Sequence, residues 1–137
     1  MTKSTRIGFT LIELMITITI VMTLAAIAVP AYINYTHRSY YSDIVEATGP
    51  YKARISECYE NLKTLTGCDG GANHIPANIT TKTGNIASLS VATDVITAIP
   101  VAAHGILSTD TYVLTPTITD HTLTWVASGD GVTNGYS

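Results

Sequence analysis

The chain has 137 residues, room for one ordinary domain, and a net charge of −3. Charged residues make up only 12% of it, against about 25% in typical soluble proteins. The slight negative charge excludes a chain-wide basic surface for nucleic acid. Abundant aliphatic residues and eight tyrosines exclude disorder for most of the chain. Two cysteines are too few for a small domain held together by several disulfides.

The apolar residues are concentrated near the N-terminus. From Phe9 to Val29 the only charged residue is Glu13, and a helix of this length, about 30 Å, spans a bilayer core. A buried core helix is disfavoured because no polar face exists from Leu14 onward. A cleaved secretory signal ending at Ala25-Ala26-Ile27-Ala28 is a second alternative, although the apolar run is longer than usual. The sequence predicts a single membrane-spanning helix.

Basic residues set the expected orientation of this helix. Lys3 and Arg6 precede the apolar run, and the next basic residue is Arg38. Because positive residues stay on the cytoplasmic side, the N-terminus is expected in the cytoplasm and the remainder across the membrane.

Glu13 is unusual because it is an acid inside an apolar segment. A carboxylate in a membrane helix costs on the order of 2–3 kcal/mol, and such residues are usually functional. The alternative role is a favourable interaction with the positive end of the helix dipole, which contributes about 0.3–1 kcal/mol. That gain is too small to offset the cost, so we expect a functional role for Glu13.

The segment Gly8-Phe9-Thr10-Leu11-Ile12-Glu13-Leu14-Met15 resembles the processing site of type IV prepilins. The resemblance implies a leader, Met1 to Gly8, that is removed after Gly8, and N-methylation of the new terminal residue, Phe9. It also implies that Glu13 acts in assembly. The stretch from Ala25 to Tyr32, with a helix bend at Pro30, is similar to the same family.

The resemblance implies a structural subunit of a type IV pilus, of type IVa character, that serves adhesion, twitching motility or DNA uptake. The implied partners are other pilin subunits, the prepilin peptidase and methylase, and the inner-membrane assembly platform. The implied location is the inner membrane before assembly and an extracellular pilus afterwards. A minor pilin or a pseudopilin of type II secretion is the first alternative. A membrane-anchored periplasmic enzyme or binding module is the second.

Beyond Pro30 the helical pattern resumes as an apolar stripe. Its members follow one another at spacings of four and three residues: Ile44, Thr48, Tyr51, Ile55, Cys58, Leu62 and Leu65. Charged residues occupy mostly the other faces, so the stripe is expected to cover an apolar surface. Pro50 lacks a backbone donor and clashes with the preceding turn, which predicts a kink there. Two separate helices with a break at Gly49 are the alternative.

Cys58 and Cys68 are the only cysteines, and they lie on the exported side by the topology argument. An oxidising compartment and the reversal at Thr66-Gly67 predict a disulfide between them. Closing this loop of about ten residues would contribute about 2–3 kcal/mol. Many type IVa pilins instead have a disulfide near the C-terminus, and this chain has no cysteine around Trp125. The family's receptor-binding loop is therefore in doubt here.

After a connection rich in Gly, Asn and Thr, the sequence predicts β-strands. The four β-type runs are residues 86–91, 95–101, 111–118 and 122–126, with a turn at Thr119-Asp120-His121. Pro116 predicts that its strand ends there, is bulged or lies at an edge. The tail from Asp130 to Ser137 is expected to cover a sheet edge or to fray.

The predicted fold is α+β, a long kinked N-terminal helix packed on a small antiparallel sheet. Residues 9–33 would form the membrane and filament-core helix, and residues 34–137 a globular head. The four histidines are scattered, so no metal site or cofactor is expected: His37, His74, His104 and His121. No nucleophile motif or phosphate-binding loop is present, which argues against an enzyme. Lys82 is the only basic residue after Lys63, so the monomer is not expected to bind nucleic acid directly.

Overall fold

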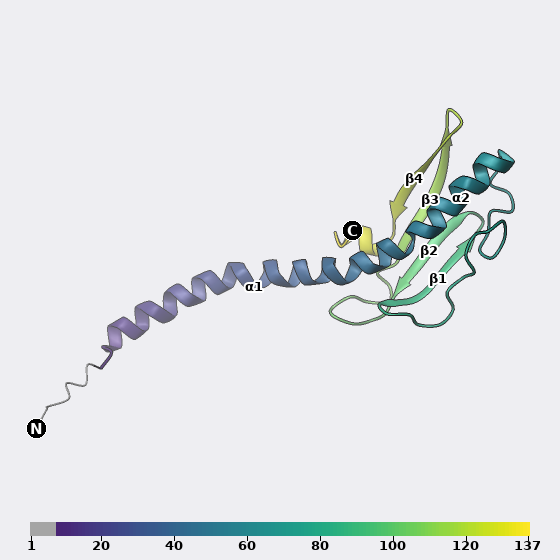
Figure 1. Cartoon of the computed structure of the whole chain (residues 1–137). Coiled ribbons are helices and arrows are strands. Elements are labelled where there is room, and N and C mark those ends of the chain that lie inside the picture. The colour runs from purple at the N-terminus through teal and green to yellow at the C-terminus, as the bar shows by residue number, and fades with distance from the viewer. Residues whose placement is uncertain (1–7) are drawn as a thin grey trace, which may run out of the picture. The chain divides into compact units, whose positions relative to one another are not determined.

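The computed structural model describes residues 8–137 (Figure 1). Residues 1–7 of the expected leader lie outside the described residues. The chain divides into two units between Asn34 and Tyr35. Helix α1, Leu11–Ala47, contributes to both units, whereas the other helices and all strands of the described chain belong to the second.

The described part of the first unit is the exposed N-terminal portion of α1. Every described residue from Gly8 to Asn34 is exposed. The helix that begins at Leu11 contains an 18-residue window with a mean hydropathy of 2.3, none of it buried, so its length and composition suffice to cross a membrane. The hydroxyls of Thr17 and Thr19 each donate to the carbonyl one turn earlier, at 2.8 Å. These threonines therefore satisfy their own polar groups within the helix.

The helical path continues beyond α1 after a single irregular residue. Helix α2, Gly49–Leu62, follows Thr48 directly. The Thr48 N–H bonds the carbonyl of Val45, three residues earlier, at 3.2 Å, and its hydroxyl bonds the same oxygen at 2.6 Å. Pro50 lies in the first turn of α2, where its missing N–H costs little. The regular helical hydrogen bonding is thus interrupted at Thr48, two residues before the kink expected at Pro50 and one before the alternative break at Gly49.

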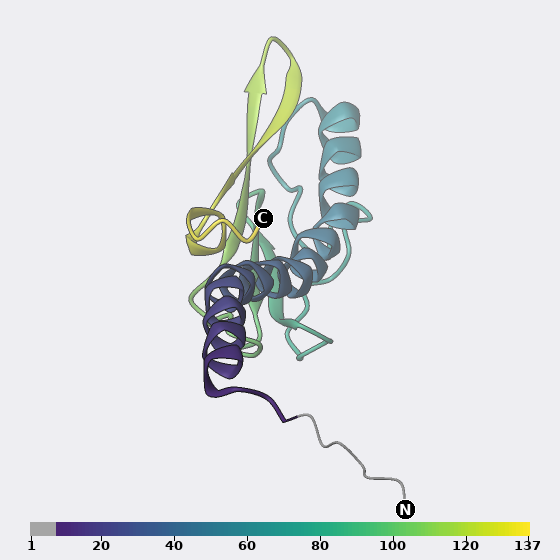
Figure 2. The same ribbon diagram turned by 90° about the vertical axis from the view of Figure 1, so that its left-hand side faces the viewer.

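The second unit contains a four-stranded antiparallel sheet in the order β1-β2-β3-β4. The strands are β1 Ile86–Ala92, β2 Val95–Pro100, β3 Tyr112–Thr119 and β4 Thr122–Ser128. Figures 1 and 2 show α2 covering one face of this sheet. The α+β fold predicted from the sequence is confirmed, and the strand ends differ from prediction by at most two residues.

Two-residue turns close both outer hairpins. Thr93 and Asp94 connect β1 to β2, and Asp120 and His121 connect β3 to β4. All four have positive φ, between 51° and 66°, the conformation that two-residue hairpins with a right-handed strand twist require.

The β3–β4 hairpin extends beyond the rest of the sheet. Strand β2 pairs with β3 only as far as Leu114, whereas β3 and β4 remain paired to Thr119 and Thr122. Pro116 lies in the part of β3 that has β4 as its only strand partner. The sequence allowed three possibilities at Pro116: the strand ends, is bulged or lies at a sheet edge. The structure shows the third, because this part of β3 is not paired with β2.

The core lies where the helical stripe meets the sheet. Ile44 and Ile55 from the helices, together with Leu89 and Ile96 from the sheet, have no exposed surface. The stripe is buried as predicted from Ile44 to Cys58. The prediction was wrong for Leu62, whose side chain is 48% exposed. Helix α2 ends at this residue, and the next, Lys63, adopts a left-handed conformation that ends the helix.

The C-terminal segment packs on the sheet, so of the two expectations for it, covering a sheet edge or fraying, the structure fits the first. Helix α3, Asp130–Thr133, is one turn that contacts β3 and β4. The Asn134 amide donates to a carboxylate oxygen of the buried Asp110 at 2.9 Å. The Arg38 Nε donates to the Gly135 carbonyl at 2.8 Å. The sequence offers no periodic pattern here because these contacts are made by single polar residues far apart in the chain.

Candidate functional site

The candidate site begins with a short hydrogen-bonded ring at the start of α1. Thr10 precedes the helix, and its hydroxyl accepts the Glu13 N–H at 3.3 Å. In return, one Glu13 carboxylate oxygen accepts the Thr10 N–H at 2.8 Å and the Thr10 hydroxyl at 2.9 Å. This reciprocal arrangement is a capping box, in which side chains satisfy backbone donors that the first turn leaves free.

The capping box gives Glu13 a local role besides the expected one in assembly. Its negative charge lies at the positive end of the helix dipole, which is favourable. Its hydrogen bonds use Oε2, and Oε1 has no hydrogen-bond partner among the described residues. One oxygen therefore remains available to an incoming donor. Sequence reasoning found Glu13 but missed Thr10, although the Thr-x-x-Glu spacing was a usable signal.

Gly8 and Phe9 precede the helix and are fully accessible. The Phe9 side chain is 86% exposed. A Cβ added at Gly8 would meet no atom within 4 Å, and Gly8 is not among the glycines with positive φ. Nothing in the described structure requires glycine at this position. Any requirement for it must come from a molecule that recognises this segment.

Large apolar side chains cover the surface of α1 up to residue 34. They are exposed by 45% or more and surround the helix: Leu11, Ile12, Leu14, Met15, Ile16, Ile18, Ile20, Val21, Met22, Leu24, Ile27, Val29, Tyr32 and Ile33. A water-exposed apolar surface of this extent is unfavourable, so it marks a region that lipid or protein covers. Pro30 lies within this portion of α1.

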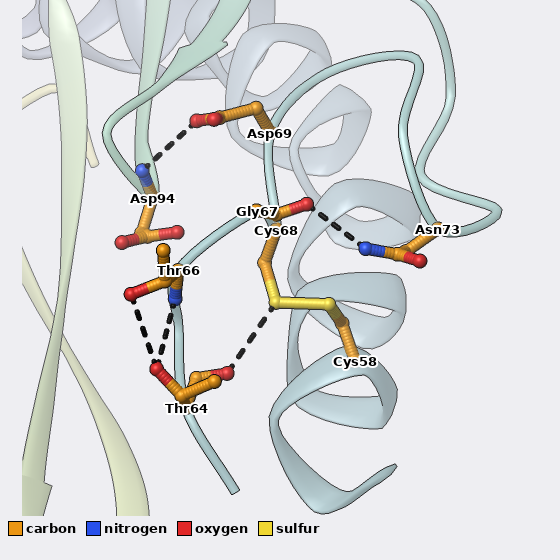
Figure 3. Close-up of a disulfide and its surroundings, with 8 residues drawn as sticks. All are labelled: Cys58, Thr64, Thr66, Gly67, Cys68, Asp69, Asn73 and Asp94. Carbon is orange, nitrogen blue, oxygen red and sulfur yellow. Dashed lines mark hydrogen bonds between the residues drawn. A yellow bond between two sulfur atoms is a disulfide. The ribbon is translucent and has the colours of Figure 1, made fainter. Parts of the chain in front are cut away.

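Cys58 and Cys68 form a disulfide that joins α2 to the loop following it (Figure 3). The two Cα atoms are 6.0 Å apart and both side chains are buried. The loop is fixed further by the Asn73 amide, which donates to the Gly67 carbonyl at 3.0 Å, and by the Asp69 carboxylate, which accepts the Asp94 N–H at 3.4 Å. The disulfide therefore connects α2 to a loop that also reaches the β1–β2 turn.

Two of the four histidines, His37 and His104, contact aromatic rings. His104 stacks on Tyr40 with ring centroids 3.8 Å apart, and His37 meets Tyr136 edge-on at 5.5 Å. No group of three His, Cys, Asp or Glu residues within residues 8–137 is arranged to hold a metal ion.

Comparisons with known proteins identify the family. A family profile described as the Prokaryotic N-terminal methylation motif matches residues 3–29. Prepilin peptidase-dependent protein D of Escherichia coli (strain K12) is 40% identical over 89 residues, which are 65% of this chain and 60% of that protein. The Type IV pilus subunit protein TapA of Aeromonas hydrophila is 39% identical over 69 residues, which are 50% of this chain and 49% of TapA. The chain thus matches less than two thirds of the length of these two relatives.

A third relative is matched over nearly all of this chain. The Type IV major fimbrial protein FimA of Dichelobacter nodosus is 36% identical over 135 residues, which are 94% of this chain and 86% of FimA. These relatives are structural subunits and not enzymes. The match therefore includes the head as well as the apolar helix, and the chain belongs to the type IV pilin family.

Proposed function

We propose that the chain is a pilin precursor that is cleaved after Gly8, N-methylated at Phe9 and polymerised through its N-terminal helix into a surface fibre. The fibre would serve adhesion, twitching motility or DNA uptake, because these are tasks of a polymer rather than of one subunit. The relatives named as pilus and fimbrial subunits support this assignment.

The observation that carries the proposal is the exposed apolar helix with a capped acid at its start. An apolar helix gains little free energy by leaving lipid for a bundle of similar helices, because both surroundings are apolar. The same surface is therefore compatible with a membrane reservoir and with a filament core. Apolar contacts alone do not fix how far one helix is shifted along its neighbour. A pair of opposite charges on the two subunits would fix that axial register.

Glu13 supplies half of that pair. Cleavage after Gly8 would create an α-amino group on Phe9, and the free Oε1 of Glu13 on a neighbouring subunit could accept its N–H. Pairing would neutralise two charges in an apolar setting, where leaving either one alone is costly. The capping box holds the carboxylate at the first turn of the helix, beside the segment that carries the new amine.

The proposal includes a route through the cell. Before assembly the subunit would lie in the inner membrane, with residues 9–33 spanning the bilayer and the N-terminus in the cytoplasm, where the prepilin peptidase and methylase act. The inner-membrane assembly platform would then transfer it to the growing fibre, with the head at residues 34–137 on the outside. Bends at Pro30 and Pro50 would fit the helix to the filament.

Electron microscopy of sheared surface fibres, with mass spectrometry of their subunits, tests this proposal. We expect abundant fibres that contain the chain starting at N-methylated Phe9. A chain found only as scarce copies among other subunits would indicate a minor pilin, and one that remains in the envelope of a secreting cell would indicate a pseudopilin. Cells that carry only unassembled, leader-free protein would contradict all three roles: major pilin, minor pilin and pseudopilin.

A further inference from the structure

We propose that a polar groove between the end of α2 and the β3–β4 turn binds a small neutral saccharide. Figures 1 and 2 show both elements at the same end of the second unit. The groove has a volume of about 340 Å³, which lies in the range of small-molecule sites. It is lined by Ser56, Tyr59, Glu60, Lys63, His121, Thr122 and Leu123. This inference goes beyond the proposed role in the fibre.

The polar side chains of the groove have no partners in the described part of the chain. Ser56, Tyr59 and Glu60 on α2 make no side-chain hydrogen bond or ion pair to any of residues 8–137, and the same holds for Lys63 and His121. Arg54 and Glu57, also on α2 but outside the groove, instead form an ion pair with each other, 2.7 Å apart. The groove therefore contains side-chain hydrogen-bond donors and acceptors that a ligand could use.

Tyr59 is the one buried polar residue of the groove. Its side chain is only 7% exposed. Among the described residues, no fully buried side-chain oxygen or nitrogen lacks a hydrogen-bond partner, so the unpaired Tyr59 hydroxyl must reach open space. The groove is the cavity that Tyr59 lines. A hydroxyl held at the base of a hollow is well placed to bond a ligand without losing much conformational entropy.

The mixture of groups defines the ligand class. Glu60 offsets the positive charge of Lys63, so the groove lacks the concentrated charge that phosphate or a polyanion would require. Hydroxyls, an amine, a carboxylate and an imidazole together donate and accept hydrogen bonds, which matches a ring of sugar hydroxyls. Leu123 adds an apolar surface for the C–H face of such a ring. A neutral mono- or disaccharide satisfies all of these features.

The chain carries its own reporter of binding. Trp125 is the only tryptophan and lies two residues from Leu123 on β4, hence on the same face of the strand. The Lys52 ammonium lies 5.9 Å from the centre of its ring. A ligand in the groove would change the surroundings of this pair, so Trp125 fluorescence should respond to binding.

The test is a titration of the detergent-solubilised full chain with glucose, galactose and N-acetylglucosamine, followed by Trp125 fluorescence. At least one sugar should give a saturable change. Tyr59→Phe should weaken its affinity about fivefold and Glu60→Gln about tenfold, because each loses one hydrogen bond and the second a charged one. Glu57→Gln, on the same helix but outside the groove, is the matched control and should leave affinity unchanged. Circular dichroism should be the same for all four proteins.

Four outcomes would overturn the proposal. The first is the absence of a saturable response to any of the three sugars, and the second is an affinity that neither groove substitution changes. Another is a stronger response to inorganic phosphate, which would make the groove an anion site. The last is a response that disappears in sheared fibres, which would mean that a second copy of the chain covers the groove. None of these results bears on whether the chain forms fibres.

Discussion

The two units of the chain differ in the exposure of their apolar side chains. In the second unit Tyr41, Ile44 and Ile55 are completely buried against the sheet. In the first unit the described residues are all exposed, and the large apolar ones among them surround the helix. The second unit has its own hydrophobic core, whereas the first depends on whatever surrounds it.

This difference separates the energetics of folding from those of assembly. Burial in the second unit stabilises the head irrespective of neighbours, because the apolar surface is removed from water within one chain. The apolar surface of the first unit contributes only when lipid or other copies cover it. Substitutions in one unit should therefore change stability, and substitutions in the other should change fibre yield.

The largest expected effect is on assembly. Glu13→Ala should reduce fibre yield to background while membrane insertion is unchanged, because the variant loses the acid of the proposed inter-subunit pair and becomes more apolar. Thr10→Ala keeps the carboxylate but loses part of the capping box, so its yield should fall to an intermediate value. Thr17→Val is the matched control, since the Thr17 hydroxyl bonds only its own helix.

Sheared-fibre yield and the membrane-bound fraction of each variant measure these effects. Normal fibres from Glu13→Ala would remove this residue from the mechanism.

A core substitution tests the other half of the comparison. Ile55→Ala should lower the free energy of unfolding of the head by about 2–5 kcal/mol, because it removes buried apolar atoms and leaves a cavity. Ile20→Ala, the same change at a side chain 54% exposed on α1, should alter it by less than about 0.5 kcal/mol. Urea denaturation of the detergent-solubilised chain, followed by Trp125 fluorescence, measures both. Equal losses would show that the two units are not energetically separate.

Loss of the disulfide should have the next largest effect on stability. Cys58→Ser combined with Cys68→Ser should lower the free energy of unfolding by about 2–3 kcal/mol, because the unfolded chain gains the entropy of an open ten-residue loop. Adding reductant to the wild-type protein should give the same loss, and adding it to the double variant should change nothing. Two free thiols in the purified protein, found by mass spectrometry, would contradict the linkage.

Much of this arrangement was predictable from local sequence patterns. Runs of β-type residues located the four strands. The four-and-three spacing located the helix face that buries Ile44 and Ile55, because periodicity indicates which face is covered. The exposure of Leu62 was not predictable in this way. A stripe does not reveal where the helix it belongs to ends, and α2 ends at that residue.

The docking of the C-terminal segment and the polar groove depend on contacts between distant residues. Asn134 reaches Asp110, and His121 comes to lie beside the end of α2, only because of how the sheet is placed. Single polar residues of this kind leave no periodic signal. In the candidate assembly site, by contrast, both Thr10 and Glu13 lie within one turn, so the whole motif was present in the sequence.

Gly131 tests how closely the C-terminal turn is packed in the head. A Cβ added there would overlap the Tyr41 hydroxyl and the ring carbons next to it, Cζ and Cε2. The hydroxyl donates to the Asp110 carbonyl at 2.9 Å. Burial, together with the nearby Asp110 and Tyr112, raises the pKa of Tyr41 well above its ordinary value, so the hydroxyl remains a donor. Gly131→Ala should therefore cost about 1–3 kcal/mol of unfolding free energy.

The control for this substitution is Gly49→Ala, where an added Cβ would meet no atom within 4 Å. Its urea denaturation curve should match that of the wild type or shift slightly to higher stability. Adding Tyr41→Phe to Gly131→Ala should recover little of the loss, because the ring atoms Cζ and Cε2 that phenylalanine keeps would still overlap the added Cβ. Full recovery would show that only the hydroxyl was in conflict.

The smallest expected effect is the pH dependence of the head at the β1–β2 turn. Burial and the nearby Asp69 carboxylate raise the pKa of Asp94 above its ordinary value of 3.8. Because a raised pKa disfavours the ionised form in the folded state, Asp94 costs stability once the pH rises above 3.8 and through its folded value. Asp94→Asn should therefore slightly raise the melting temperature at neutral pH, since asparagine also tolerates the left-handed backbone at this position.

The gain should disappear well below pH 3.8, where both side chains are neutral. Asp120→Asn, at the first position of the β3–β4 turn, controls for the loss of an exposed turn charge. Fibre yield should be the same for both variants, because both lie in the unit whose core is complete without neighbours. A variant that changed fibre yield but not melting temperature would place this turn in a contact between subunits.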